Sequence, residues 1–394
     1  MTSGRHEVSL LFGLIVYSEF ARSGEADHPT GCVFLDGTVS LPFGLGRPRK
    51  LDGGGDMGLL IGFLLVFLAG VLQGTFILPM TLTRRWNWEH TWAAFSFFGM
   101  LAFNWGITLL AIPNIISVYR LVPPRNIAIL TLFGAGWGLG AILFGLGMDK
   151  LGMALGYPII MGLIASLGAL IPLLVFSPAA VFEAKGVVLL IGTVIMILGI
   201  AVCSFAGVRE PRSSGSQSRA NSHGFAAGLV IAIAAGVLSC LPNVGMAFGT
   251  SVIVAAQALG TSRTYSGNAI WALFFTVGFL LNFGYGFYLM ARHKNLNAYL
   301  SQEAARNFGL SALMAIMWIV SFYLYGMGAA KLGKWGVVVG WPLFISLSIA
   351  VGNLWGILRG EWQDAPRSAR ILLYRGLFVL LIAVITIAGS NLLL

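Results

Sequence analysis

The side chains with the chemistry to bind a solute are amides and aromatic rings within long apolar segments. A buried amide in a membrane helix is costly unless it is paired, so each one needs a polar partner or a polar ligand. Aromatic rings beside such amides cover the apolar parts of a small molecule in a dry cavity. We therefore predict a binding site for a small polar solute formed by Gln73, Asn104, Trp137, Asn243, Asn282, Trp318, Tyr323, Tyr325 and Trp341.

Each of these residues has a structural alternative. The amides could join neighbouring helices by hydrogen bonds, and the tyrosines could pack with local hydrogen bonds. Trp341 lies near the start of its apolar segment, where a tryptophan of the membrane interface would also lie. Trp137 and Trp318 lie near the middle of theirs, which favours a place in the cavity wall.

Catalytic and metal-binding patterns do not occur in the apolar segments. After Met57, every Asp, Glu and His falls at a segment end or in a loop, and no Ser/His/Asp set, carboxylate pair or metal-ligand spacing shares one segment. We predict no enzyme activity, no metal and no cofactor.

Only two carboxylates are candidates for carrying a proton. Glu89 stands at the mouth of the second apolar segment and Asp149 at the end of the third. The alternative is that they form ion pairs with Arg85 and Lys150. A proton relay usually needs a titratable group within the bundle, and none lies at the middle of a segment. The residues therefore predict weak or absent proton coupling.

These side chains are positioned by ten apolar segments of membrane-spanning length. The chain is 57% apolar and only 10% charged, whereas about a quarter of a soluble domain is charged. The net charge of +10 is spread singly through short loops, which favours an anionic membrane surface over nucleic acid. We predict an all-α integral membrane protein with spans at 58–80, 92–112, 127–148, 153–176, 185–207, 224–243, 268–291, 308–329, 336–358 and 371–392.

The two halves of the chain repeat each other. Asn104-Trp105-Gly106 returns as Asn282-Phe283-Gly284, and Trp137 with its following glycines returns at Trp318. Five helices per repeat give the second half the opposite orientation, and inverted repeats with a solute site between them are typical of transporters. We predict repeats at 57–207 and 224–394, a polar linker at 208–223, and an extension or misplaced start at 1–56.

At several of these motifs the sequence resembles the L-rhamnose–proton symporter family of the drug/metabolite transporter superfamily. The resemblance is carried by residues 85–89 (RWNWE), 133–140 (FGAGWGLG), 151–156 (LGMALG) and 360–362 (GEW). It implies ten helices and the import of L-rhamnose or a related deoxy sugar by alternating access, driven by protons. The alternatives are an exporter of drugs, metabolites or amino acids with the same fold, and a membrane sensor or scaffold.

Loop charges predict the orientation of the chain in a bacterial inner membrane. The loops after the odd-numbered helices hold 13 Arg and Lys, and the opposite loops hold 6. Because Lys and Arg accumulate on the cytoplasmic side, we predict that the odd-numbered loops face the cytoplasm. The direction of transport and the oligomeric state stay open.

Overall fold

The computed structural model describes residues 56–208, 222–333, 336–360, 362–363 and 365–389. The predicted N-terminal extension and the predicted linker lie almost entirely outside the described residues. The described part is helical without strands, and ten of its helical stretches are long and apolar enough to cross a membrane. The all-α fold with ten spans is therefore confirmed.

The helices follow in the order α2 (Asp56–Thr75), η1 (Leu78–Leu82), α3 (Trp88–Ser96), η2 (Phe97–Phe103), α4 (Asn104–Ala111), α5 (Ile115–Leu121), α6 (Pro124–Phe176), η3 (Pro178–Phe182), α7 (Ala184–Val208), α8 (Ser222–Ser239), α9 (Leu241–Phe248), α10 (Thr250–Ala258), α11 (Asn268–His293), η5 (Leu296–Leu300), α12 (Ala304–Lys331), α13 (Gly336–Leu358) and α14 (Arg367–Gly389).

Helix α6 carries the third and fourth spans, 124–148 and 159–176, and turns back on itself between them. The ring centroids of Phe144 and Tyr157 lie 6.5 Å apart, although thirteen residues of straight helix would separate them by about 20 Å. The predicted division between these spans is thus confirmed, and the backbone stays helical through the turn.

The second span is not a regular α-helix. Its middle, η2, is π-helical and joins α3 to α4 without a break. A π-helical turn inserts an extra residue into a helix, and such turns recur at functional sites. The insertion shifts every later residue of the span, including Asn104, relative to α3.

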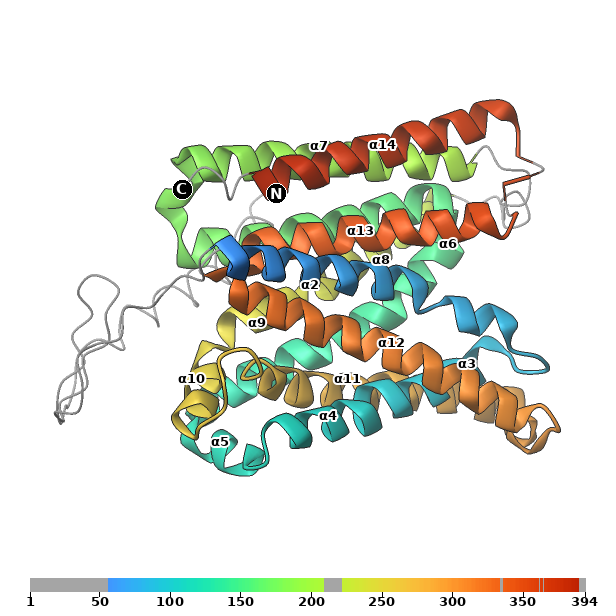
Figure 1. Cartoon of the computed structure of the whole chain (residues 1–394). Coiled ribbons are helices and arrows are strands. Elements are labelled where there is room, and N and C mark those ends of the chain that lie inside the picture. The colour runs from blue at the N-terminus through green and yellow to red at the C-terminus, as the bar shows by residue number, and fades with distance from the viewer. Residues whose placement is uncertain (1–55, 209–221, 334–335, 361, 364, 390–394) are drawn as a thin grey trace, which may run out of the picture. The chain divides into compact units, whose positions relative to one another are not determined.

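Glycines let helices of the two halves approach closely. Helix α2 packs against α12 and α13, α8 packs against α6, and α7 pairs with α14, as Figure 1 also shows. A Cβ on Gly70 of α2 would lie 2.5 Å from the Cβ of Leu347 in α13. A Cβ on Gly236 of α8 would lie 2.6 Å from the Cβ of Leu163 in α6. Larger residues would force these helices apart.

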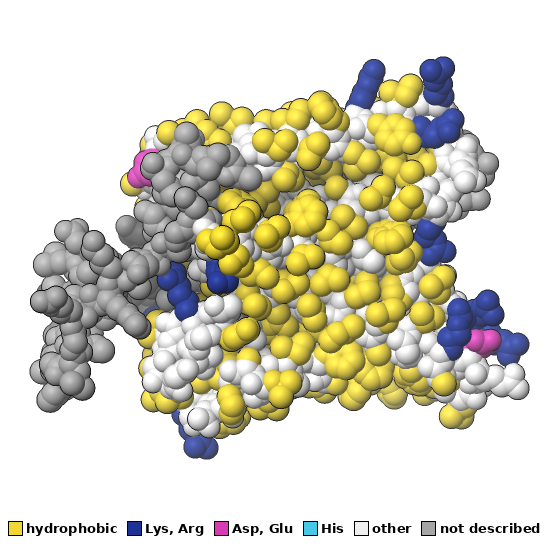
Figure 2. All heavy atoms as spheres, viewed as in Figure 1, with side chains coloured by type: hydrophobic (Ala, Val, Ile, Leu, Met, Phe, Trp, Pro, Cys, Tyr) yellow, Lys and Arg dark blue, Asp and Glu magenta, His cyan; other side chains and the backbone are white. Residues whose placement is uncertain are grey.

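The alternating glycines of α6 face two different neighbours. A Cβ on Gly134 would lie 2.3 Å from the Phe274 carbonyl oxygen of α11, and Gly138 meets the same helix at Gly278. Gly136 and Gly140 instead meet Leu241 and Leu238, on the α8–α9 side. Figure 2 shows the outer surface that results, with apolar side chains across the middle of the visible face and Lys and Arg near its two ends.

Candidate functional site

Aromatic rings from the third, seventh and eighth spans meet at the centre of the bundle. Trp137 and Trp318, the predicted repeat-related pair, stack with their ring centroids 5.8 Å apart and an interplanar angle of 22°. Phe275 contacts both rings, and Phe322 contacts Trp318. The structure thus brings the two predicted tryptophans together.

Asn104 forms a polar cluster beside these rings. Its amide nitrogen donates to the carbonyl oxygens of Met100 and Trp271, at 3.0 and 3.1 Å. Its side-chain oxygen accepts from the Tyr323 hydroxyl at 2.7 Å, and Thr108 is hydrogen-bonded to the same hydroxyl at 2.8 Å. Three spans are joined through this one buried amide.

Asn243 forms a second cluster with two other predicted residues. Its oxygen accepts a hydrogen bond from the Tyr325 hydroxyl, and its nitrogen donates to the carbonyl oxygens of Gly168 and Val337. Trp341 packs edge-on against Tyr325 and donates to a carbonyl oxygen of α6. Because Trp341 is only 2% exposed, it is a core residue and not an interface tryptophan.

Asn282 and Gln73 lie in separate contacts. Asn282 accepts from the Trp92 indole at 3.1 Å and donates to the carbonyl oxygens of Gly138 and Gly278. Gln73 accepts from the Ser321 hydroxyl at 2.8 Å, which links α2 to α12. All four predicted amides therefore join helices in this structure. Their part in binding a solute stays a prediction.

Glu89 is a buried carboxylate at one end of the spans, where it meets the end of α11 and the segment that follows. Its carboxylate accepts hydrogen bonds from Asn87, His293 and Asn295, the last two at 3.0 Å, and its side chain is 8% exposed. The predicted pairing with Arg85 is wrong, because His293, 204 residues away in sequence, provides the ion-pair partner.

Further hydrogen bonds surround this carboxylate. His90 accepts at Nδ1 from the Asn87 amide and is therefore a donor at Nε2, to the Asn295 carbonyl oxygen at 3.0 Å. Burial and the charge of Glu89 raise the pKa of Tyr299 to about 12, so its hydroxyl stays protonated and donates to the His90 carbonyl oxygen. Nearby, Trp86 donates to the Ala298 carbonyl oxygen at 3.1 Å, and the Asn307 side chain is hydrogen-bonded to the Arg84 backbone. We call this set the polar latch; it consists of Arg84, Trp86, Asn87, Glu89, His90, His293, Asn295, Ala298, Tyr299 and Asn307.

Asp149, the other predicted proton carrier, lies in the turn of α6, and its side chain is outside the described residues. Within the described part of the chain, no three His, Cys, Asp or Glu side chains gather as metal ligands would.

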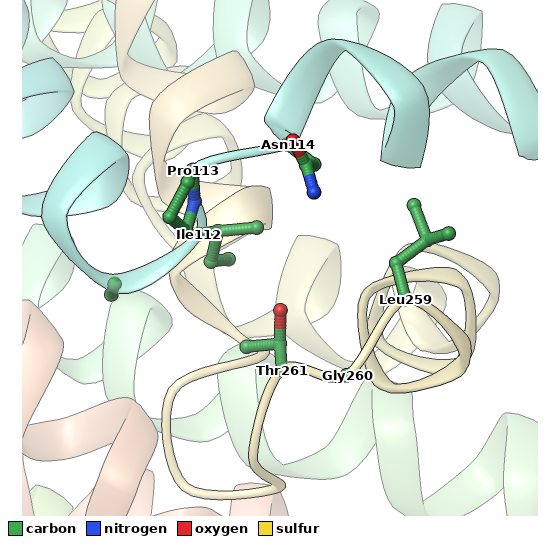
Figure 3. A pocket seen from close by; sticks show the side chains of 7 residues that line it. Ile112, Pro113, Asn114, Leu259, Gly260 and Thr261 are labelled. Atoms are coloured by element: carbon green, nitrogen blue, oxygen red, sulfur yellow. The ribbon is translucent and has the colours of Figure 1, made fainter.

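A small cavity lies at the opposite end of the spans. It has a volume of about 100 Å³ and is formed by residues 111–114, after α4, and 259–261, after α10. In Figure 3 the Asn114 and Thr261 side chains point into it from opposite sides. Unlike the polar latch, this end places no carboxylate among the cavity residues.

Sequence reasoning missed three residues that the structure places in these sites. His293 ends α11 and Asn295 follows it, and nothing in the sequence links them to Glu89. Trp271 of α11, fully buried beside Asn104, could have been found from the repeat, because Trp92 and Trp271 precede the paired Asn104 and Asn282 at nearly equal spacing.

Comparison with known proteins supports the architecture as a whole. The chain is 29% identical over 332 residues to the L-rhamnose-proton symporter of Cronobacter sakazakii, covering 82% of this chain and 96% of that protein. The symporters of Pectobacterium atrosepticum and Yersinia pestis are 27% and 26% identical over the same coverage. The family of L-rhamnose-proton symport proteins matches residues 56–392. Since this match spans all ten helices and both repeat-related tryptophans, the chain belongs to the L-rhamnose-proton symport protein family, a family of multi-pass inner-membrane transporters and not of enzymes.

Proposed function

We propose that this protein imports L-rhamnose or a closely related deoxy sugar together with a proton, by alternating access. The observation that carries the proposal is the aromatic and amide centre of the bundle, in a chain of this family. A deoxy sugar has a methyl group and an apolar ring face as well as hydroxyls. Stacked indoles suit the methyl group and the apolar ring face, and amide and phenol groups suit the hydroxyls.

We also propose that the halves are inverted repeats, with the sugar site between them. Matching contacts support this arrangement. A Cβ on Gly62 would lie 3.1 Å from Leu332, and a Cβ on Gly228, its partner 166 residues later, would lie 2.9 Å from Leu151. Leu151 and Leu332 are themselves separated by 181 residues, as are Trp137 and Trp318.

The sugar would take over hydrogen bonds that now join the helices. Asn104 and Asn243 each accept a hydrogen bond from a tyrosine hydroxyl. A sugar hydroxyl could replace either partner, so that neither the amide nor the tyrosine hydroxyl would be left buried without a hydrogen bond. Such an exchange of partners couples binding to a rearrangement between spans, as alternating access requires.

We propose Glu89 as the proton-carrying group, in place of the weak coupling that the sequence predicted. That prediction assumed that the proton must bind at the middle of a span. Glu89 is instead buried at a contact between the halves. A proton on the carboxylate removes its charge and weakens its bonds to His293 and Asn295. Tyr299 also lies near this group, His90 binds the Asn295 carbonyl oxygen, and the exposed Arg292 and Lys294 flank His293.

Uptake into proteoliposomes tests the function. With an inward proton gradient, we expect labelled L-rhamnose or a related deoxy sugar to accumulate above its outside concentration, and to stop doing so when a protonophore collapses the gradient. A transporter that takes up no deoxy sugar from a panel, or takes one up with equal speed and extent without the gradient, contradicts the proposal.

A further inference from the structure

The Trp271 indole is a buried hydrogen-bond donor without an acceptor. Its side chain is 0% exposed, and Nε1 has no hydrogen-bond partner among the described residues. Its ring is fixed by stacking on Phe275, at 5.5 Å between centroids and 14° between planes, and by edge contact with Phe322. An unpaired buried N–H is destabilising, so a donor kept in such a rigid place needs an explanation.

The other half of the chain shows what this donor lacks. Trp92 donates its indole hydrogen to the Asn282 side-chain oxygen at 3.1 Å. The repeat-related pair would be Trp271 and Asn104, but the Asn104 oxygen accepts from Tyr323 instead. The indole of Trp271 is therefore left free at the position where its counterpart is satisfied.

The helix geometry keeps the two pairs comparable. Trp92 precedes Asn104 by twelve residues, whereas Trp271 precedes Asn282 by eleven. The π-helical segment η2, which lies between Trp92 and Asn104, accommodates one more residue. The two spans thus match again beyond η2. The difference between the halves is the donor to each amide oxygen, which is Trp92 for Asn282 and Tyr323 for Asn104.

The free donor lies between the two predicted polar clusters. The Trp271 backbone oxygen accepts from Asn104, while Nε1 faces Gly326, the residue after Tyr325. A Cβ at Gly326 would lie 3.1 Å from Nε1 and 3.5 Å from the Met246 methyl group. Gly326 has no side chain to cover Nε1, and the flexible Met246 side chain can move aside. A ligand atom could therefore reach Nε1.

We propose that Trp271 Nε1 donates a hydrogen bond to a hydroxyl oxygen of the transported sugar. This inference rests on the proposed function and adds a binding residue to it. An indole N–H only donates, so it suits an uncharged oxygen acceptor and rejects a cation. The stacked Phe275 holds the donor in place before the sugar arrives, which reduces the entropy lost on binding.

The test compares Trp271→Phe with Trp92→Phe in the full chain, measuring L-rhamnose affinity by titration calorimetry and thermal stability without sugar. Trp271→Phe keeps the aromatic contacts and removes an unsatisfied donor. We expect its sugar Kd to rise roughly tenfold or more, with an unchanged or higher melting temperature. Trp92→Phe leaves Asn282 without its donor, so its melting temperature should fall while its sugar Kd changes less than threefold.

Three further results decide between explanations. If Trp271→Phe folds and binds L-rhamnose like wild type, the donor is satisfied by water or stays closed off, and the inference is wrong. If Trp271→Phe fails to fold, Gly326→Ala, which places a methyl group against Nε1, should raise the sugar Kd, and an unchanged Kd overturns the inference. A wild type that binds no deoxy sugar instead overturns the proposed function, and this inference with it.

Discussion

The proposed inverted repeat makes the loops at the two ends of the spans equivalent, yet these loops differ in their chemistry. At the polar latch, the start of α3 and the loop before it meet the end of α11 and the loop after it, through a buried carboxylate, two histidines and buried amides. At the cavity end, the loops after the second and sixth spans enclose about 100 Å³, and Asn126 nearby donates to Ser251, a bond between two neutral groups. Among the described residues, the polar latch holds a buried carboxylate, and the residues that line the cavity include none.

We infer from this difference that the opening of the two ends depends differently on protons. Neutral hydrogen bonds give an end that opens with little dependence on protons, whereas a buried carboxylate ties opening to its state of charge. The loop charges predict that the polar latch faces the cytoplasm. On that side, the proposed proton-dependent latch would release the solute inward only after the proton has bound.

The largest effect is expected when the charge of the latch is removed. Glu89→Gln mimics the protonated carboxyl and can no longer gain or lose a proton. We expect proton-driven accumulation in proteoliposomes to fall to the equilibrium level, while exchange of labelled for unlabelled sugar continues.

Glu303→Gln is the matched control for that variant. Glu303 lies at the same end and pairs with Arg306 at 3.7 Å, but both side chains are substantially exposed, so this pair contributes little. Accumulation by Glu303→Gln should equal that of wild type. If accumulation persists in Glu89→Gln, Glu89 does not carry the proton, and the two ends do not differ in their dependence on protons.

A smaller effect is expected when each end loses a neutral amide. Asn307, fully buried, exchanges two hydrogen bonds with the Arg84 backbone at the latch, at 3.2 and 2.7 Å. Asn126 donates to Ser251 at the other end. Since a lost buried hydrogen bond costs about 1–3 kcal/mol, Asn307→Ala should speed hydrogen exchange of residues 83–90 and 293–303 by roughly 5- to 100-fold.

Asn126→Ala should act on residues 249–263 instead, and more weakly, because it loses one partly exposed bond. Mass spectrometry of the exchanged protein distinguishes the two regions. If both variants speed exchange equally at both ends, the ends open together and the comparison fails.

The sequence predicted the spans well because membrane thickness demands long apolar segments, whatever their partners. Small residues four apart likewise predict a close helix contact wherever it lies, and Gly134 and Gly138 of α6 follow this rule against α11. The partner of Glu89 was not predictable in this way. Arg85 is close in sequence, but the contact with His293 depends on how the start of α3 meets the end of α11. The unpaired indole N–H of Trp271 was likewise not predictable, because it depends on the Tyr323 hydroxyl donating to the Asn104 side-chain oxygen.

The smallest expected effect concerns backbone strain, which also differs between the ends. Lys294, beside the latch, has φ of 55° and ends α11 in the left-handed conformation, and Arg85 has φ of 60°. At the cavity end the corresponding positive φ, 90°, belongs to Gly260. A non-glycine residue in this conformation costs about 1–2 kcal/mol relative to the right-handed one. Replacing it with glycine removes this strain, but the greater freedom of glycine in the unfolded chain offsets part of the stabilisation.

Lys294→Gly should therefore stabilise the protein by about 0.5–1 kcal/mol, and Gly260→Ala should destabilise it by a similar amount, both read as shifts in the detergent melting temperature. Neither residue bonds Glu89, so sugar accumulation should stay at the wild-type level in both. A stabilised Lys294→Gly with slower uptake would show that the strain itself helps the latch to part. The latch would then depend on stored backbone energy as well as on the charge of Glu89, and the two ends would differ in mechanics as well as in chemistry.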